Sequence, residues 1–106
     1  MSKYTVKELW DKIYGKQEQC YDYAGRLMLK SACGNPNSQF EPTIDHIRPL
    51  AKRGKNNIKN MIICHCKTNE EKGNSFPCWK ANGRRFCAIK NKDTDINAYY
   101  TICPQK

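Results

Sequence analysis

Five residues near the middle of the chain have side chains that could share one chemical task. Asp45 and His46 are adjacent, Asn60 follows His46 by fourteen residues, and Asn69 and Lys72 lie nine and twelve residues after Asn60. An imidazole group exchanges a proton near neutral pH, and carboxylate and amide oxygens are accepted as ligands by hard divalent cations. A lysine can neutralise a nearby anion. The spacing of these five residues suits one shared site.

Three short elements would have to position these side chains. Residues 43–47 and 60–64 read as two strands, and residues 67–72 are compatible with a helix. A helix laid across a pair of strands brings the end of the first strand close to the face of the helix. We therefore expect a strand, a loop, a second strand and a helix around the site.

The prediction of one shared site requires a particular position of His46 on its strand. Neighbouring residues of a regular strand point to opposite faces, so Asp45 and His46 can serve one site only where the strand ends or twists. Pro49 follows three residues after His46 and cannot continue a central strand. The sequence therefore predicts His46 at a strand terminus.

The order of these residues resembles a known family of nucleases. The sequence reads Ile44-Asp45-His46-Ile47-Arg48-Pro49, then Asn60-Met-Ile-Ile-Cys-His65, then Asn69-Glu-Glu-Lys72. These three blocks are similar, in order and spacing, to the core pattern of the HNH endonucleases, and the resemblance covers about residues 20–79. It implies a ββα-metal fold that hydrolyses phosphodiester bonds with one divalent cation. Three spaced blocks are more specific than any one motif alone.

The resemblance also implies roles for individual residues. It makes His46 the general base that activates water, and Asp45 and Asn69 the ligands of Mg²⁺, Mn²⁺ or another divalent cation. Asn60 would orient the His46 ring, or the loop that carries it, by hydrogen bonding. His65 is a further metal ligand in some members of the family and a supporting residue in others, and both readings stay open.

The charge of the chain is concentrated in its middle. The formal net charge is +9, and residues 46–92 carry twelve basic side chains against only Glu70 and Glu71. Such a block is typical of a protein that binds a polyanion, most often nucleic acid. A solvated basic surface that only keeps the protein in solution is the alternative. The candidates for phosphate contacts are Lys52, Arg53, Lys55, Lys59, Lys72, Arg84 and Arg85.

The seven cysteines do not form the usual zinc pattern. No Cys-x-x-Cys pair occurs, and the two candidate knuckles read Cys20-Tyr-Asp-Tyr23 and Cys64-His-Cys-Lys67. Many relatives of the HNH type carry such knuckles as pairs of cysteines. We therefore expect reduced thiols rather than structural zinc, for which the best available set would be Cys20, Cys33, Cys64 and Cys66.

The remaining segments, taken with the central ones, indicate an α+β fold. Thr5 to Glu8 reads as a capping box before an amphipathic helix that stops at Gly15. A strand is expected over Arg26–Ala32, a tight hairpin turn at Asn82-Gly83, and a last strand over about Ala98–Ile102 that closes the sheet. The chain is expected to be one domain, residues 1–106, with a catalytic ββα-metal core at about 40–74, an N-terminal helix and a C-terminal hairpin.

These observations favour a metal-dependent endonuclease that cuts DNA. A nuclease that acts on RNA is one alternative, and a non-catalytic module that only binds nucleic acid is another. No apolar run approaches the length of a membrane span and no secretory signal is evident, so a cytoplasmic location is expected. A short chain leaves little surface for reading bases, so low sequence specificity, or a partner protein that supplies specificity, is expected.

Overall fold

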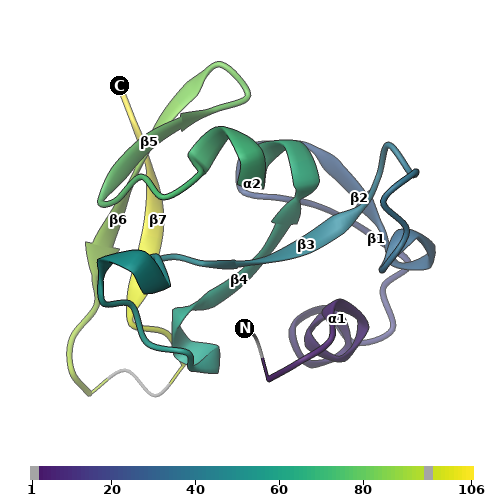
Figure 1. The fold of residues 1–106 in the computed structure, drawn as a ribbon, viewed down its shortest axis with the longest axis horizontal. Helices are drawn as coiled ribbons and strands as arrows, with labels where there is room; N and C mark the ends of the chain where they lie inside the picture. The colour runs from purple at the N-terminus through teal and green to yellow at the C-terminus, as the bar shows by residue number, and fades with distance from the viewer. Residues whose placement is uncertain (1–2, 95–96) are drawn as a thin grey trace.

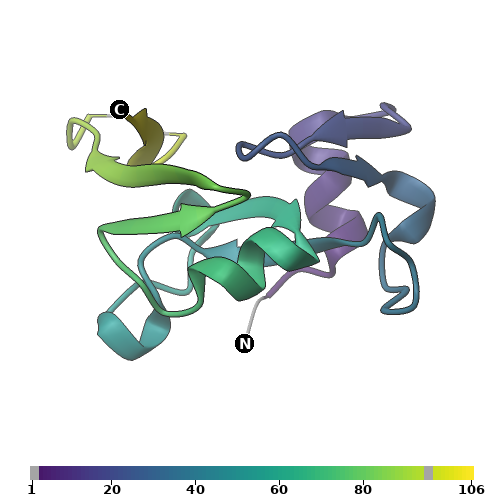
Figure 2. The same ribbon diagram turned by 90° about the horizontal axis from the view of Figure 1, so that it is seen from above.

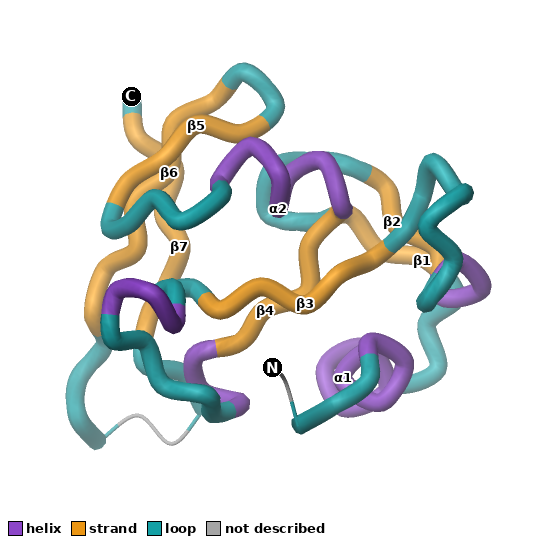
Figure 3. Tube along the Cα trace, viewed as in Figure 1, coloured by secondary structure: helices purple, strands orange, loops and turns teal. Residues whose placement is uncertain are grey.

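The centre of the structure is a two-stranded antiparallel hairpin with a short helix across it (Figure 1). The computed structural model describes residues 3–94 and 97–106. Its helices and strands are α1 (Val6–Tyr14), β1 (Gln19–Tyr21), β2 (Leu27–Leu29), β3 (Pro42–His46), β4 (Met61–His65), α2 (Cys66–Lys72), β5 (Cys78–Ala81), β6 (Arg84–Lys90) and β7 (Tyr100–Gln105). Loops take up much of the chain between these short elements (Figure 3).

The central hairpin is formed by β3 and β4. Asp45 pairs with Ile62 and His46 with Met61, which closes the ladder at its loop end. Helix α2 follows β4 without a connecting loop and contacts both strands. The predicted order of strand, loop, strand and helix is therefore confirmed, and each predicted boundary lies within one residue of the observed one.

An N-terminal unit packs on one side of the hairpin. The capping box of α1 is present: the Glu8 amide donates to Thr5 Oγ1 at 3.1 Å, and the Thr5 amide donates to Glu8 Oε1 at 2.9 Å. The helix ends at Gly15, where φ is +61°. The strand predicted over Arg26–Ala32 is wrong in part, because β1 offers only three pairing residues. The chain turns into a 3-10 helix over Lys30–Ala32 after β2 ends.

A three-stranded antiparallel sheet of β5, β6 and β7 packs on the other side (Figures 1 and 2). The predicted turn between β5 and β6 is confirmed, with positive φ at both Asn82 and Gly83, as two-residue hairpin turns require. The last strand pairs with β6 as expected, although it runs over Tyr100–Gln105 and starts later than predicted.

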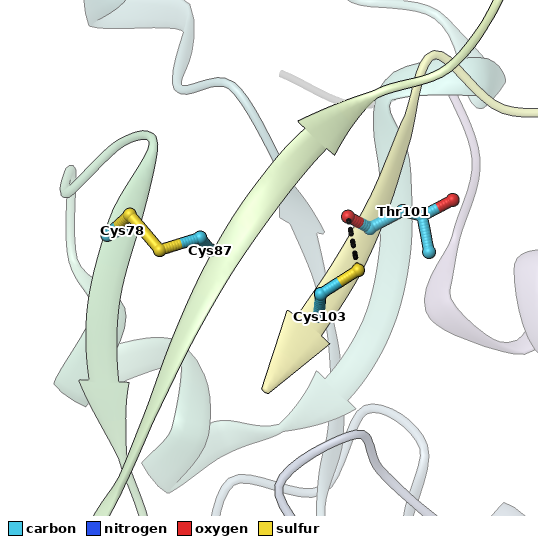
Figure 4. Close-up of a disulfide and its surroundings, with 4 residues drawn as sticks. All are labelled: Cys78, Cys87, Thr101 and Cys103. Carbon is cyan, nitrogen blue, oxygen red and sulfur yellow. Dashed lines mark hydrogen bonds between the residues drawn. A yellow bond between two sulfur atoms is a disulfide. The ribbon is translucent and has the colours of Figure 1, made fainter. Parts of the chain in front are cut away.

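One pair of cysteines differs from the expectation of reduced thiols. Cys78 and Cys87 are directly opposite in the β5–β6 register and form a disulfide. Cys103 on β7 is in turn the partner of Cys87 across the β6–β7 ladder, and it stays a free thiol (Figure 4). The two-residue turn predicted at Asn82-Gly83 fixes this register, so it is the sequence signal that could have placed Cys78 opposite Cys87.

Two apolar clusters hold the units together through the central hairpin. Alternation along β4 sends Met61 and Ile63 into the cluster under α1, which also contains Leu9 and Trp10. Ile62 points the other way, into the cluster under the C-terminal sheet, whose other members are Ala24, Ile47, Trp79, Ala81, Phe86 and Ala88. Trp79 is only 5% exposed in this second cluster. None of the helices in the described ranges is long and apolar enough to span a bilayer.

Candidate active site

Asp45 and His46 meet at one surface cavity, although they are neighbours on a strand. His46 is the last residue of β3, as predicted. The cavity has a volume of about 220 Å³ and is lined by Ile44, Asp45, His46, Pro49, Leu50, Ala51, Gly73 and Asn74. Because the strand ends at His46, the alternation of a regular strand does not separate the two side chains. The geometric condition set by the sequence is met.

The ring of His46 is held by a residue that the sequence analysis did not assign. His46 Nε2 lies 3.0 Å from Asn56 Oδ1. An amide oxygen can only accept, so Nε2 carries the proton, and in the neutral ring the lone pair is on Nδ1. Asn56 lies in the loop between β3 and β4. Its spacing of ten residues from His46 carries no signal of its own, and the contact depends on how the loop folds back.

Asp45 is buried beside a buried lysine. The Asp45 and Lys72 side chains are 8% and 0% exposed, and Lys72 Nζ lies 3.1 Å from Asp45 Oδ2. This is an ion-pair distance, but Oδ2 has no hydrogen-bond partner of good geometry among the described residues. Burial raises the pKa of Asp45, and the nearby Lys72 charge opposes this effect.

Lys72 does not occupy the surface position expected of a phosphate contact. Its ammonium lies 3.4 Å from the His46 carbonyl oxygen and 5.0 Å from the centre of the Trp79 ring. The side chain is enclosed between α2, the end of β3 and the C-terminal sheet. The prediction of a direct contact between Lys72 and substrate phosphate is therefore corrected: its charge acts on Asp45.

Asn69 lies on α2 against the same strand. Its Nδ2 donates to Thr43 Oγ1 at 3.0 Å and approaches the Ile44 carbonyl oxygen at 3.3 Å. These contacts direct the amide nitrogen to β3 and leave the amide oxygen as its available acceptor. Asp45 and Asn69 thus provide a carboxylate and an amide oxygen, which are ligand types that fit Mg²⁺ or Mn²⁺; Asp45 lines the cavity and Asn69 does not.

Asn60 is buried and fixes the loop that follows His46. Its Oδ1 accepts from the Arg48 amide at 2.9 Å, and its Nδ2 donates to the carbonyl oxygens of Arg48 and Lys55 at 3.0 and 2.8 Å. Of the two readings that the sequence left open, the contacts match the orientation of the loop and not of the ring. The ring is held by Asn56, which the same loop carries.

Residues 37–78 match the family model described as HNH endonuclease. This segment contains β3, β4, α2 and the loop between the strands. By this match, the segment is similar to the HNH endonuclease family. The family implies a ββα-metal core, a divalent cation and a nucleic-acid substrate. No curated protein and no solved structure matches the chain.

The HNH segment ends within β5, so much of the C-terminal sheet lies outside it. Residues 79–106 contribute most of β5 and all of β6 and β7, and Trp79 is the residue against which Lys72 packs. The N-terminal unit of α1, β1 and β2 also lies outside the matched residues. The elements that enclose the candidate site therefore come from both inside and outside the HNH segment.

His65 is occupied in a structural role. Its Nε2 lies 2.6 Å from the Gln39 carbonyl oxygen, and its Nδ1 accepts from the Lys67 amide at 3.0 Å, which caps α2. Both ring nitrogens are engaged, and His65 pairs with Pro42 at the end of the ladder away from His46. The reading of His65 as a metal ligand is therefore corrected in favour of a supporting residue.

The other predicted residues lie around these elements. Lys52, Arg53 and Lys55 are exposed on the loop between β3 and β4, Lys59 is half-buried at its end, and Arg84 and Arg85 are exposed at the start of β6.

In the described ranges, no group of three or more His, Cys, Asp or Glu side chains is arranged to hold a metal. Of the four thiols considered for zinc, Cys64 is buried in the hairpin, and Cys20 donates to Gln17 Oε1 at 3.0 Å.

Proposed function

We propose that this protein is a metal-dependent endonuclease that hydrolyses phosphodiester bonds in DNA. The observation that carries the proposal is the cavity shared by Asp45 and His46, at the end of the strand that the HNH family uses for its active site. The excess of basic residues in the same part of the chain supports a polyanionic substrate. A single domain in the cytoplasm is part of the same proposal.

His46 acts as the general base. With Nε2 protonated and donating to Asn56, the lone pair on Nδ1 is free to take a proton from the attacking water. Asn56 holds the ring in one orientation and favours one tautomer, which reduces the reorganisation needed during the reaction. The protonated ring can then return its proton to solvent.

Asp45 and Asn69 are the residues that would hold the divalent cation. A bound cation supplies charge that stabilises the negative oxygens of the phosphodiester as it reacts. Asp45 provides a buried carboxylate oxygen without a hydrogen-bond partner, and Asn69 provides an amide oxygen from α2. The Lys72 charge favours the ionised form of this carboxylate and so opposes burial, which raises its pKa.

A plasmid-relaxation assay with Mg²⁺ or Mn²⁺ tests this function. The wild-type protein should nick or cut the plasmid, EDTA should abolish cleavage, and His46→Ala should lower the rate by about 10²–10⁴-fold, because removal of a positioned base has an effect of that size. Lys16→Ala is the matched control, since Lys16 is exposed at the end of the N-terminal helix. Circular dichroism should show the same fold for each variant.

Other outcomes point to the alternatives. Cleavage of RNA but not DNA under the same conditions would replace the substrate class and keep the role of His46. Salt-sensitive binding of DNA without any cleavage of DNA or RNA would favour a module that only binds nucleic acid. Cleavage that His46→Ala leaves unchanged would contradict the proposed base.

A further inference from the structure

A second cavity lies on the other side of the loop that borders the catalytic cavity. It has a volume of about 250 Å³ and is lined by Arg48, Arg53, Lys55, Asn60, Lys90, Asp93, Tyr99 and Tyr100. We call it the basic pocket. One wall comes from the loop between β3 and β4, and the other comes from the end of β6 and the start of β7. The second wall lies outside the residues that match the HNH family.

The charges in the basic pocket are mostly uncompensated. Four cationic side chains face a single carboxylate, Asp93, which lies 3.8 Å from Lys90 in an exposed pair. Within residues 3–94 and 97–106, no carboxylate lies at ion-pair distance from the other three cations. A concave surface with a net positive charge attracts an anion more strongly than the same charges spread over a flat surface.

The aromatic residues hold the basic side chains in place. Lys55 Nζ and Lys59 Nζ each lie 5.6 Å from the centre of the Tyr99 ring, so two ammonium groups converge on one side chain. The Tyr99 amide donates to the Lys59 carbonyl oxygen at 2.9 Å, which ties the C-terminal segment to the loop. Such preorganisation lowers the entropy lost when a ligand binds.

Arg48 is fixed in the same way. Its Nε donates to the Lys52 carbonyl oxygen at 2.7 Å, and its guanidinium lies 5.6 Å from the centre of the Phe76 ring. Phe76 in turn packs edge-to-face on Tyr100, at 5.3 Å between ring centres. The hydrogen bonds described for Arg48 leave its two terminal nitrogens as donors toward the pocket, and a guanidinium recognises phosphate oxygens with paired donors.

The basic pocket and the catalytic cavity share the loop after His46. Pro49, Leu50 and Ala51 line the catalytic cavity, while Arg48 and Arg53, on either side of them in sequence, line the basic pocket. Neighbouring residues of one short loop turn therefore line both cavities. A nucleic-acid strand that places one phosphate beside His46 can reach the basic pocket with another.

We propose that the basic pocket binds a backbone phosphate of the nucleic-acid strand, separate from the phosphate at which hydrolysis would occur. This inference rests on the proposed function. It assigns a substrate-positioning role to Arg48 and to Lys90, Tyr99 and Tyr100 of the C-terminal sheet. The pocket would fix the register of the strand, because contacts with phosphate position a nucleic acid without reading its sequence.

A pair of charge-matched double variants tests the pocket. Arg53→Gln with Lys90→Gln removes one cation from each wall, and Lys7→Gln with Lys16→Gln removes two exposed cations from the N-terminal unit. Binding of a fluorescently labelled DNA oligonucleotide is measured by anisotropy at several NaCl concentrations, in EDTA so that no cleavage occurs.

The pocket variant should lose about one unit of slope in log affinity against log salt, because each phosphate contact contributes about 0.9 to that slope. At about 0.1 M salt the same contact corresponds to a loss of affinity of roughly eightfold. The control variant should keep the wild-type slope. Equal slopes for the two variants would overturn the proposal.

Two further measurements separate this inference from the proposed function. In cleavage assays the pocket variant should raise KM and leave kcat unchanged, whereas His46→Ala should lower kcat. The binding measurement does not depend on cleavage. If the wild-type protein never cuts DNA, the proposed function is wrong, but the salt dependence of DNA binding still tests the pocket. Calorimetric titration with inorganic phosphate is the other arm. Binding of free phosphate as tightly as the oligonucleotide would overturn the assignment to a nucleic-acid strand.

Discussion

At the scale of single residues, two opposing effects act on the Asp45 carboxyl group. Burial raises its pKa, and the Lys72 ammonium 3.1 Å away lowers it, with burial as the larger effect. A carboxyl whose folded-state pKa is raised binds its proton more tightly in the folded chain than in the unfolded chain. Its contribution to the free energy of unfolding is therefore largest below its ordinary pKa of 3.8 and falls as the pH rises through the folded value.

Replacing Lys72 should change the pH dependence of cleavage. In Lys72→Met the opposing charge is lost, so the pKa of Asp45 should rise further, and a higher pH is needed to ionise this proposed metal ligand. The acid limb of the pH–rate profile should move to higher pH. Lys67→Met is the matched control, because Lys67 is an exposed residue of the same helix. An acid limb that both variants leave in the wild-type position would contradict the role given to Lys72.

At the scale of elements, the loop between β3 and β4 is shaped mainly by one buried side chain. Asn60 makes three hydrogen bonds to the backbone of Arg48 and Lys55, and so closes the loop on itself. Gly54 allows this closure, since a Cβ atom there would lie 1.7 Å from the Arg48 carbonyl oxygen. The same loop carries Asn56, the partner of His46, and one wall of the basic pocket.

The variant Asn60→Ala should lower both stability and activity. It leaves buried backbone groups without partners, so the free energy of unfolding should fall by about 2–4 kcal/mol. Cleavage should fall as well, because the support of Asn56 and His46 is lost. Asn57→Ala is the control in the same loop, where one exposed hydrogen bond from the Lys59 amide is removed, and it should cost about 1 kcal/mol or less. Urea denaturation measures the free energy of unfolding of both variants. Similar losses of stability in Asn60→Ala and Asn57→Ala would contradict the dominant role of Asn60.

At the scale of the whole molecule, the central hairpin is held from both sides by apolar clusters. One cluster joins it to the N-terminal helix and the other to the C-terminal sheet. The HNH segment alone lacks most of the residues of both clusters. The exposed basic side chains lie on a loop and at the edge of a hairpin, where they can contact phosphates, and not on a long helix that could enter a groove.

Cleavage by the isolated protein should therefore show little sequence preference. A good bidentate contact with a base contributes about 1–3 kcal/mol of discrimination, and phosphate contacts contribute none directly. Cleavage rates at different sites should fall within about tenfold of each other, which corresponds to the lower end of the discrimination that one base contact provides. Sequencing the ends produced from a randomised DNA library measures this preference. Cleavage confined to one defined sequence would contradict the prediction, and a partner protein would then be unnecessary for specificity.

The sequence was enough to predict the order of the central elements and the strand end at which His46 lies. Strand propensity, Pro49 and the helix-compatible residues 67–72 predicted the hairpin and helix to within one residue, because these signals are local. The terminal position of His46 followed from the alternation of strand side chains, and the three spaced blocks indicated the HNH family. Each of these predictions depended on residues close to one another in the chain.

Tertiary structure decided what the side chains do once they are placed. The burial of Lys72, the engagement of both His65 nitrogens and the contact of Asn56 with His46 depend on segments that spacing does not relate. The basic pocket has the same origin, since it joins residues of the loop between β3 and β4 to residues near the C-terminus. Local sequence sets backbone preference, but burial and partners are properties of packing between distant segments, and these properties determine the charge and reactivity of each group.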